Sequence, residues 1–214
     1  MAERNRKYPK LTYEQKQMML GSLLGDAGLH CRVRNGYKQF EFYVAHGPKQ
    51  LKYIKHTAKM LGANVGKYRQ GPSSFCAGDI YYRYSYSNKQ ELQKIYDLCF
   101  KNGKKLVSSK WIKEIDHLAL AHWFMDDGSS SFDITNNKTV MVRFATQSFS
   151  KKENLLLIKK LSEFGIEATL RKITDGTGYN IYVRQKSVNK LMDIVEPHII
   201  TSDMKYKIKR REDS

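Results

Sequence analysis

The sequence predicts an α+β protein built from two pseudo-symmetric domains, residues 1–105 and 106–214. Two observations lead to this prediction. Signals for helix, hairpin, helix, hairpin and helix follow one another in the same order in each half, and each half contains an apolar helix that ends in an aspartate. A chain of 214 residues with 41% hydrophobic content can bury two cores of this size.

The first half begins with a helix and a tight hairpin. Thr12 and Gln15 form a capping box, which starts a helix that ends near Ala27. Residues 29–45 then alternate between apolar and polar side chains around Asn35-Gly36. Both turn residues accept a positive φ, so this pattern predicts a β-hairpin.

The rest of the first half repeats the helix and hairpin. Pro48 suits the first turn of a helix, and Gly62 suits its C-terminal stop. A second hairpin is predicted over residues 64–86. A third helix over about residues 89–101 follows Asn88, which is a favoured N-terminal cap.

The second half follows the same plan after a join near residues 103–113. Its predicted elements are a helix at 117–127, a strand pair at 129–134 and 139–147 around Asn136-Asn137, a helix after the capping box at Ser150 and Glu153, a hairpin at 167–185, and a helix at 187–195. Phe164-Gly165 ends a helix as Leu61-Gly62 does in the first half. These matches indicate a duplicated unit.

The charge of the chain predicts a polyanionic partner. Lys and Arg number 38 against 21 Asp and Glu, which gives a formal net charge of +17. Nucleic acid fits best, because each neutralised phosphate releases a condensed counterion. Basic residues alternate with apolar ones along predicted strands, as in Arg32-Val33-Arg34, and this period of two gathers them on one face of a sheet.

The sequence also bounds where the protein works. No apolar run approaches the ~20 residues of a membrane span, and the charged segment from Met1 to Lys10 is unlike a secretory signal. The three cysteines, Cys31, Cys76 and Cys99, are an odd number without metal-binding spacing. We therefore expect no membrane partner and an intracellular, reducing compartment, either an organelle matrix or a prokaryotic cytoplasm.

The residues that we expect to carry out catalysis lie in two apolar segments at matching positions of the halves. Met19 to Ala27 and Leu120 to Gly128 each contain an aspartate near the helix end, and Asp26 and Asp127 lie 101 residues apart. An aspartate is unfavourable at the negative end of a helix dipole. Two such ends side by side would form an anionic oxygen cluster that suits Mg²⁺, and this predicts metal-assisted phosphodiester hydrolysis.

Both segments resemble the signature of the LAGLIDADG homing endonucleases, in the single-chain, two-repeat form that mobile introns encode. The second segment, followed by Thr146-Gln147-Ser148-Phe149, is especially similar to the yeast-mitochondrial type. The resemblance implies two αββαββα domains packed through the signature helices, each with a four-stranded antiparallel sheet on the DNA major groove. It also implies a monomeric, site-specific double-strand DNA endonuclease that leaves short 3′ overhangs at a long non-palindromic site.

The resemblance assigns roles to particular residues. Asp26 and Asp127 would bind Mg²⁺, with Mn²⁺ as a substitute, and the carbonyl oxygens of Gly25 and Asp126 would line the same sites. Three further candidates for catalysis are Lys105, Lys207 and Gln147, with His46 at roughly the place of Gln147 in the first half. His122 stands where the family has a small residue, and we expect it to pack in the helix seam opposite Gly21 or Gly25 rather than act as a base.

Strand residues are the candidates for base reading, with about half of them expected to face DNA. They are Arg32, Arg34, Lys38, Gln39, Glu41, Tyr43, Arg69, Arg83, Lys138, Arg143, Arg171, Lys172, Asn180, Tyr182 and Arg184. Arginine pairs with guanine, and glutamine or asparagine pairs with adenine, through two hydrogen bonds.

Two other functions remain open at this point. The first is a binding protein on the same fold, either an intron RNA maturase or a DNA-binding regulator. Loss of either aspartate would favour it, and both are present, although RNA binding is compatible with intact acids. The second is an intein endonuclease domain, which would need flanking splicing blocks that we do not expect in these 214 residues.

Overall fold

The computed structural model describes residues 9–71, 78–133, 139–174, 176 and 178–210. Cys76, Lys138 and the turn at Asn136-Asn137 lie outside these residues. Within the described part of the chain, no helix is long and apolar enough to cross a membrane. Cys31 and Cys99 are free thiols, and Cys99 is buried.

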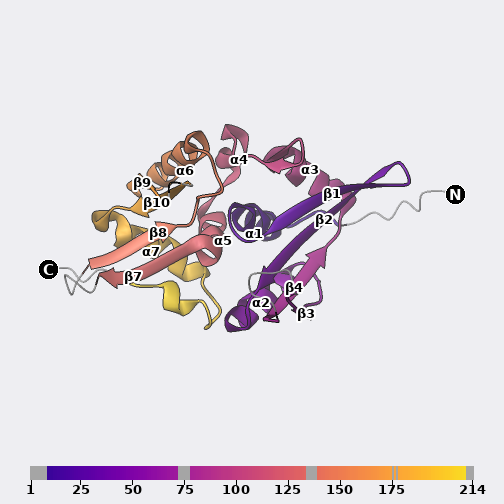
Figure 1. Cartoon of the computed structure of the whole chain (residues 1–214), viewed down its shortest axis with the longest axis horizontal. Coiled ribbons are helices and arrows are strands. Elements are labelled where there is room, and N and C mark those ends of the chain that lie inside the picture. The colour runs from indigo at the N-terminus through magenta and orange to yellow at the C-terminus, as the bar shows by residue number, and fades with distance from the viewer. Residues whose placement is uncertain (1–8, 72–77, 134–138, 175, 177, 211–214) are drawn as a thin grey trace.

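The first half forms a four-stranded antiparallel sheet covered by helices on one face (Figure 1). Its strand order is β1-β2-β4-β3. The elements are α1 (Tyr13–Leu24), β1 (Gly28–Arg34), β2 (Tyr37–His46), α2 (Leu51–Met60), β3 (Gly66–Arg69), β4 (Ile80–Tyr86) and α3 (Lys89–Cys99). A single 3₁₀ turn, Pro48–Gln50, leads into α2.

The second half forms a matching sheet, in the order β7-β8-β10-β9. Its elements are α5 (His117–Asp127), β7 (Gly128–Asp133), β8 (Thr139–Phe144), α6 (Lys151–Glu163), β9 (Ala168–Lys172), β10 (Tyr179–Val183) and α7 (Val188–Val195). Three 3₁₀ turns lie at Gln185–Ser187, Glu196–His198 and Lys205–Lys207. The predicted α+β fold with two antiparallel four-stranded sheets is therefore confirmed.

The local signals in the sequence work as expected. The capping boxes at Thr12 and Ser150 are both formed, and Asn88 accepts from the Glu91 N–H. Asn35 and Gly36 have φ values of 51° and 78°, as the β1–β2 turn requires. The join differs from the prediction, because it contains a short strand pair, β5 (Phe100–Lys101) and β6 (Lys104–Lys105), and a helix, α4 (Ser109–Glu114).

The helices α1 and α5 pack against each other at the centre of the molecule. Figure 1 shows α1 viewed almost end-on between the two sheets. A Cβ on Gly21 would collide with the backbone of Ala119, and one on Gly25 would collide with the Cβ of Asp126. The two glycines therefore allow the close approach of the helices that their spacing predicts.

Hydrogen bonds also tie the halves together away from this seam. The Asp203 carboxylate accepts from the backbone N–H groups of Lys52 and Tyr53, at 2.6 Å and 3.1 Å, and so caps α2 from the other half. The Lys52 ammonium group also donates to Ser202 Oγ over 2.8 Å. The start of α2 is thus satisfied partly by the second half.

Candidate active site

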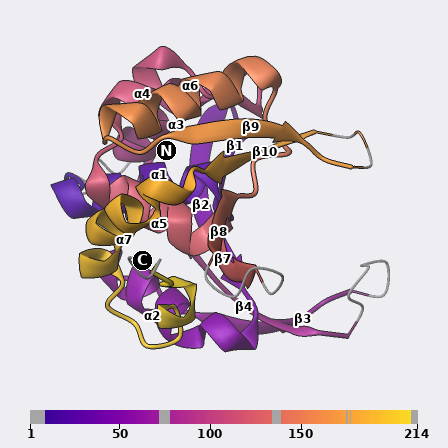
Figure 2. The same cartoon turned by 90° about the vertical axis from the view of Figure 1, so that its left-hand side faces the viewer.

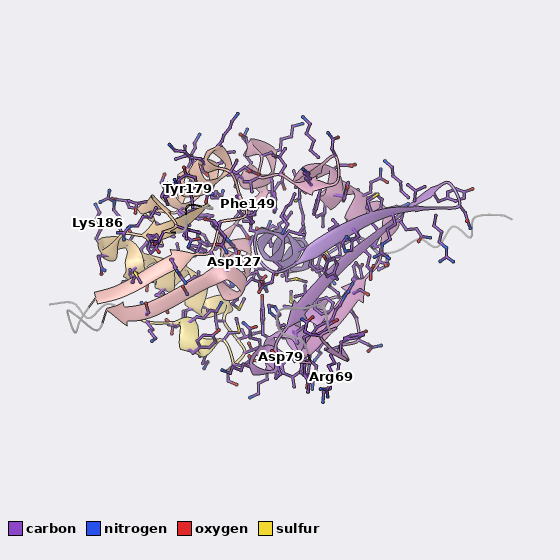
Figure 3. The ribbon with its side chains drawn as sticks, viewed as in Figure 1. Arg69, Asp79, Asp127, Phe149, Tyr179 and Lys186 are labelled. Carbon is purple, nitrogen blue, oxygen red and sulfur yellow. The ribbon has the colours of Figure 1, made fainter. Side chains whose placement is uncertain are left out.

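The two signature aspartates lie beside each other at the ends of α1 and α5. Asp127 is the last residue of α5, and Asp26 follows α1 by two residues. Figure 3 shows Asp127 near the middle of the molecule, beside the end of α1. Burial raises the pKa of Asp127 to about 7, and the charge of Asp26 acts in the same direction.

A lysine lies at each helix end, as the resemblance implied for Lys105 and Lys207. Lys105 Nζ donates to the carbonyls of Ala27 at 3.2 Å and Gly25 at 3.5 Å. Lys207 Nζ donates to the carbonyls of Phe124, Met125 and Asp126. Burial lowers the pKa of both ammonium groups, while the nearby aspartates oppose that shift.

These contacts explain how two helix ends of the same sign can meet. The last carbonyls of a helix have no partners within it, and cations are favoured at that end. The structure thus places ammonium groups on Gly25 and Asp126, whose carbonyl oxygens we expected to face a metal ion. Each lysine thereby reaches the region between the two aspartates.

The side chain of Asp126 crosses from the second half into the first. Its carboxyl group is fully buried, and its Oδ1 accepts a hydrogen bond from Tyr53 on α2 over 2.9 Å. The Tyr53 hydroxyl also lies 3.2 Å from Nδ1 of His122. Burial, followed by the charge of Asp26, raises the pKa of Asp126 well above its usual range.

The position of His122 corrects one expectation. The atoms nearest to Gly21 and Gly25 across the seam belong to Ala119 and Asp126, while the His122 ring stacks on Tyr53 at 6.1 Å between centroids. It is packed at the interface as expected, but against α2. Burial lowers the pKa of His122 to about 3, so the ring is neutral near pH 7.

His46, at the end of β2, lies between two carboxylates. Its Nδ1 is 3.5 Å from Asp26 Oδ2, and its Nε2 is 3.6 Å from Asp126 Oδ1. Only 2% of its side chain is exposed, against 43% for Asp26. Asp26 therefore has solvent on one side and a buried imidazole on the other.

Strand register corrects the match between the halves at this position. Leu29, three residues after Asp26, pairs with Phe42, and Ser130, three residues after Asp127, pairs with Val142. Phe42 and Val142 therefore correspond, and four residues further His46 corresponds to Thr146 rather than to Gln147. Gln147 lies exposed just after the buried Thr146, and its catalytic role stays a prediction.

The donors at this site fit a hard divalent cation. Asp26 and Asp127 offer carboxylate oxygens, the helix ends offer carbonyl oxygens, and Asp126 Oδ2 is buried without a hydrogen-bond partner. In the described part of the chain, Asp26, His46 and Asp126 are the group of acids and histidines whose ligand atoms lie within 4.8 Å of one another.

The faces of the first sheet sort the candidate base readers. Phe40, Phe42 and Val44 are buried under the helices, so the residues that alternate with them point to the open face. The register places Arg32, Arg34, Gln39, Glu41, Tyr43 and Arg83 there. The Arg83 guanidinium lies 4.5 Å from the centre of the Tyr43 ring and 3.6 Å from Glu41.

The second sheet presents the same arrangement. Arg143, Tyr182, Asn180 and Arg171 share its open face, and Arg184 follows in the same alternation just past the end of β10. The Arg171 guanidinium lies 4.7 Å from the centre of the Tyr182 ring. Figure 2 shows the β3–β4 and β9–β10 hairpins projecting on the same side of the molecule.

Four candidates are corrected by register and burial. Lys38, Arg69 and Lys172 pair with Val33, Ile80 and Tyr179, and these pairs lie on the helix-covered faces. Asn180 is on the open face but buried, and its Oδ1 accepts from the Thr146 N–H over 3.1 Å. These positions argue against base reading by the four side chains, and Lys138 lies outside the described residues.

Sequence reasoning missed Tyr53 and the side-chain role of Asp126. Tyr53 is part of the apolar stripe of an amphipathic helix, and nothing local separates it from a core residue. Asp126 replaces a small residue of the signature, which was the one available signal. Its partners come from α2 and β2, more than 70 residues away in the chain.

Comparison with known proteins agrees with this geometry. The model of the LAGLIDADG DNA endonuclease family matches residues 16–191. Protein RecA of Mycolicibacterium flavescens is 28% identical over 208 residues, which cover 93% of this chain and 47% of that protein. This chain therefore spans about half the length of that curated relative. Cytochrome b mRNA maturase bI2 of Debaryomyces hansenii is 27% identical, over 92% of this chain and 74% of that protein.

A solved structure shares the whole fold. The homing endonuclease I-WcaI, bound to its DNA recognition sequence, superposes with a TM-score of 0.79. The superposition covers 99% of this chain and 96% of that one, at 22% sequence identity. The family match extends over most of the sequence and includes both signature helices with their aspartates. The chain belongs to the LAGLIDADG DNA endonuclease family.

Proposed function

We propose that the protein is a site-specific double-strand DNA endonuclease of the single-chain, two-repeat type, similar to the yeast-mitochondrial intron-encoded enzymes. It acts as a monomer, with its domains dividing near residues 105 and 106. One observation carries the proposal. Two aspartates at adjoining helix ends, each with a lysine beside it, lie between two sheets with basic open faces.

The residues of the two sheets position the DNA. Arginine side chains on the open faces contact phosphates and bases in the groove, and their separation into two sheets matches two halves of one long, non-palindromic site. The identity of the bases read by each half differs, because the open faces differ in sequence. The proposed product is a double-strand break with short 3′ overhangs.

The aspartates and lysines supply the chemistry at each strand. Asp26 and Asp127 would hold Mg²⁺ or, in its place, Mn²⁺, which would supply an activated water and charge neutralisation at the phosphate. Lys105 and Lys207 place ammonium groups where negative charge develops during hydrolysis. Their depressed pKa also suits them to hold or release a proton at Nζ.

Cleavage of a randomised duplex library with Mg²⁺, followed by sequencing of the ends, tests this function and identifies the target. We expect discrete double-strand breaks that Asp26→Asn and Asp127→Asn each reduce by about a thousandfold, since metal ions contribute several kcal/mol. Asp97→Asn, on the exposed side of α3, is the matched control and should cut normally. Selective DNA binding without cutting in either metal would contradict the proposal and indicate a DNA-binding regulator.

A second function is compatible with the first. The similarity to the bI2 maturase favours binding of intron RNA. A filter-binding assay with intron RNA tests it, with a scrambled RNA of equal length as the control. Equal affinity for the two RNAs would leave only the charge of the chain as the cause of binding.

A further inference from the structure

The buried carboxyl group of Asp126 lies behind the imidazole of His46. Tyr53 donates to Asp126 Oδ1 over 2.9 Å, and the same oxygen lies 3.6 Å from His46 Nε2. An acceptor oxygen beside one ring nitrogen favours the tautomer that carries the ring proton there, which leaves the lone pair on Nδ1. That nitrogen faces Asp26 at 3.5 Å.

Two atoms of this group lack partners although they are buried. His46 Nε2 and Asp126 Oδ2 have no hydrogen bond, and the two side chains are exposed by 2% and 0%. Burying such groups unpaired is unfavourable. A cation on Nδ1 would strengthen the Nε2 N–H as a donor to Asp126 and so relieve part of this cost.

The spacing suits one shared cation. Two ligand atoms about 2.1 Å from the same ion lie about 3.0–3.4 Å apart, at angles between a right angle and a tetrahedral one. The 3.5 Å between Asp26 Oδ2 and His46 Nδ1 is within a small side-chain adjustment of that range. Asp26 is exposed enough to admit the ion from solvent.

The second half has a threonine in place of this imidazole. At the position that corresponds to His46, the Thr146 hydroxyl donates to the Tyr179 carbonyl over 3.2 Å, and its N–H donates to Asn180. Its hydrogen bonds are thus used within the sheet. The ligand oxygens near Asp127 in the described residues are the Asp26 carboxylate and the carbonyls at the end of α5.

We propose that the Asp26 half binds its cation through one nitrogen and one carboxylate, His46 Nδ1 and Asp26, whereas the Asp127 half binds through oxygen alone. Asp126 and Tyr53 act as positioning residues that orient the imidazole. The inference rests on the proposed function for its biological meaning. It implies that the first half prefers ions that accept imidazole, while the second suits Mg²⁺ and similar hard ions.

Pulsed electron paramagnetic resonance of Mn²⁺ added to the whole chain without DNA tests the assignment. Nitrogen modulation of the Mn²⁺ spin echo reports a bound imidazole directly and does not depend on cleavage. We expect it in the native protein and in Asp127→Asn, and we expect it to disappear in His46→Gln and Asp26→Asn. His117→Gln, an exposed histidine at the start of α5, is the matched control and keeps the signal.

The positioning role has its own test. Asp126→Asn and Tyr53→Phe should weaken Mn²⁺ binding by about 10- to 100-fold at the nitrogen-coupled site, the usual effect of losing a group behind a metal ligand. The nitrogen modulation should return at higher Mn²⁺ concentration, which a misfolded variant would not show. Unchanged affinity in both variants would limit the site to Asp26 and His46 and overturn the role of Asp126.

The central proposal is overturned if the native chain binds no Mn²⁺, if its bound Mn²⁺ lacks nitrogen modulation, or if the modulation survives in His46→Gln. These outcomes are separate from those of the cleavage assay. A chain that cuts DNA with an oxygen-only Mn²⁺ signal would retain the proposed function and lose this inference.

Discussion

The two halves of the active centre keep the same groups at the helix ends and differ in what lies behind them. Each has an aspartate and a lysine that donates to helix carbonyls. Behind Asp26 are His46 and the buried Asp126, whereas the position matching His46 in the second half is Thr146, which bonds to its own sheet. The two halves thus share the groups proposed for catalysis and differ in the residues that support them.

The divergence begins at one position of the signature. Gly25 in α1 has no side chain, and the matching Asp126 in α5 fills the space over it. A carboxylate therefore crosses from the second half into the first, and no side chain crosses at this point in the other direction. Asymmetry between the two proposed cutting sites follows from this difference in size and charge, together with the difference between His46 and Thr146.

The lysines offer the largest test of this comparison. Lys105→Met and Lys207→Met should each lower cleavage by about 10²–10³-fold, the usual effect of removing one donor to a developing negative charge. Lys207→Met should also lower the free energy of unfolding by about 1–3 kcal/mol, because the buried carbonyls at the end of α5 lose the ammonium group that donates to them. Lys105→Met, with longer contacts, should lower it less.

Single-turnover cleavage and urea unfolding measure the two effects. Lys186→Met is the control, since this lysine makes a surface ion pair with Glu167 far from Asp127 (Figure 3). Equal losses of stability at Lys105 and Lys207 would mean that the two helix ends are satisfied in the same way.

The glycines of the seam give a somewhat smaller effect. Gly21→Ala should destabilise the fold by about 3 kcal/mol, because the new methyl group meets the Ala119 backbone, which cannot move aside. Gly25→Ala meets the side chain of Asp126 instead and should cost less, while displacing that carboxylate from Tyr53. Urea unfolding compares both with Gly47→Ala, which has open space around it. A neutral Gly21→Ala would contradict the close packing.

The hydrogen bonds made by Tyr53 and Thr146, which lie behind the two aspartates, should have a smaller effect on stability. Tyr53→Phe should lower the free energy of unfolding by about 2 kcal/mol, since it leaves the buried Asp126 without its donor. Thr146→Val removes one neutral hydrogen bond in the second half and should cost about 1 kcal/mol. Thermal or urea unfolding shows which of the two variants loses more stability. A larger loss at Thr146 would show that the second half carries the more critical support.

Two neighbouring residues on opposite faces of one sheet give the smallest effect. Arg171→Ala should relax base preference at one position of the target by about 1–3 kcal/mol, because its guanidinium lies on the open face over Tyr182. Lys172→Ala should change affinity slightly and equally for all sequences. Competition binding against single-base target variants measures both. A change of base preference in Lys172→Ala would contradict the assignment of faces.

The sequence was informative where structure depends on near neighbours. The capping boxes, the Asn35-Gly36 turn and the spacing of Gly21 and Gly25 act within a few residues, and all are found as predicted. The approach of Asp26 to Asp127 was predicted from their matching positions in the two repeats. The basic faces were predicted only in part, since alternation was clear but the register was not, and Lys38 and Lys172 fall on the covered side.

Contacts between the halves could not be predicted in the same way. The approach of Asp126 to Tyr53 and His46 depends on the angle at which α1 and α5 cross and on the depth of α2. The capping of α2 by Asp203 joins residues about 150 positions apart. No local pattern encodes such distances, and the resemblance of the signatures describes each repeat separately.

The capping of α2 by the opposite half limits how modular this protein is. Asp203, in the second half, completes the start of α2 in the first. A hybrid made by joining one half of this chain to half of a relative would inherit an unfinished helix start unless the donor carries an acid at the place of Asp203. A hybrid designed to recognise a new DNA target should therefore take α2 and the C-terminal segment that contains Asp203 from the same parent protein.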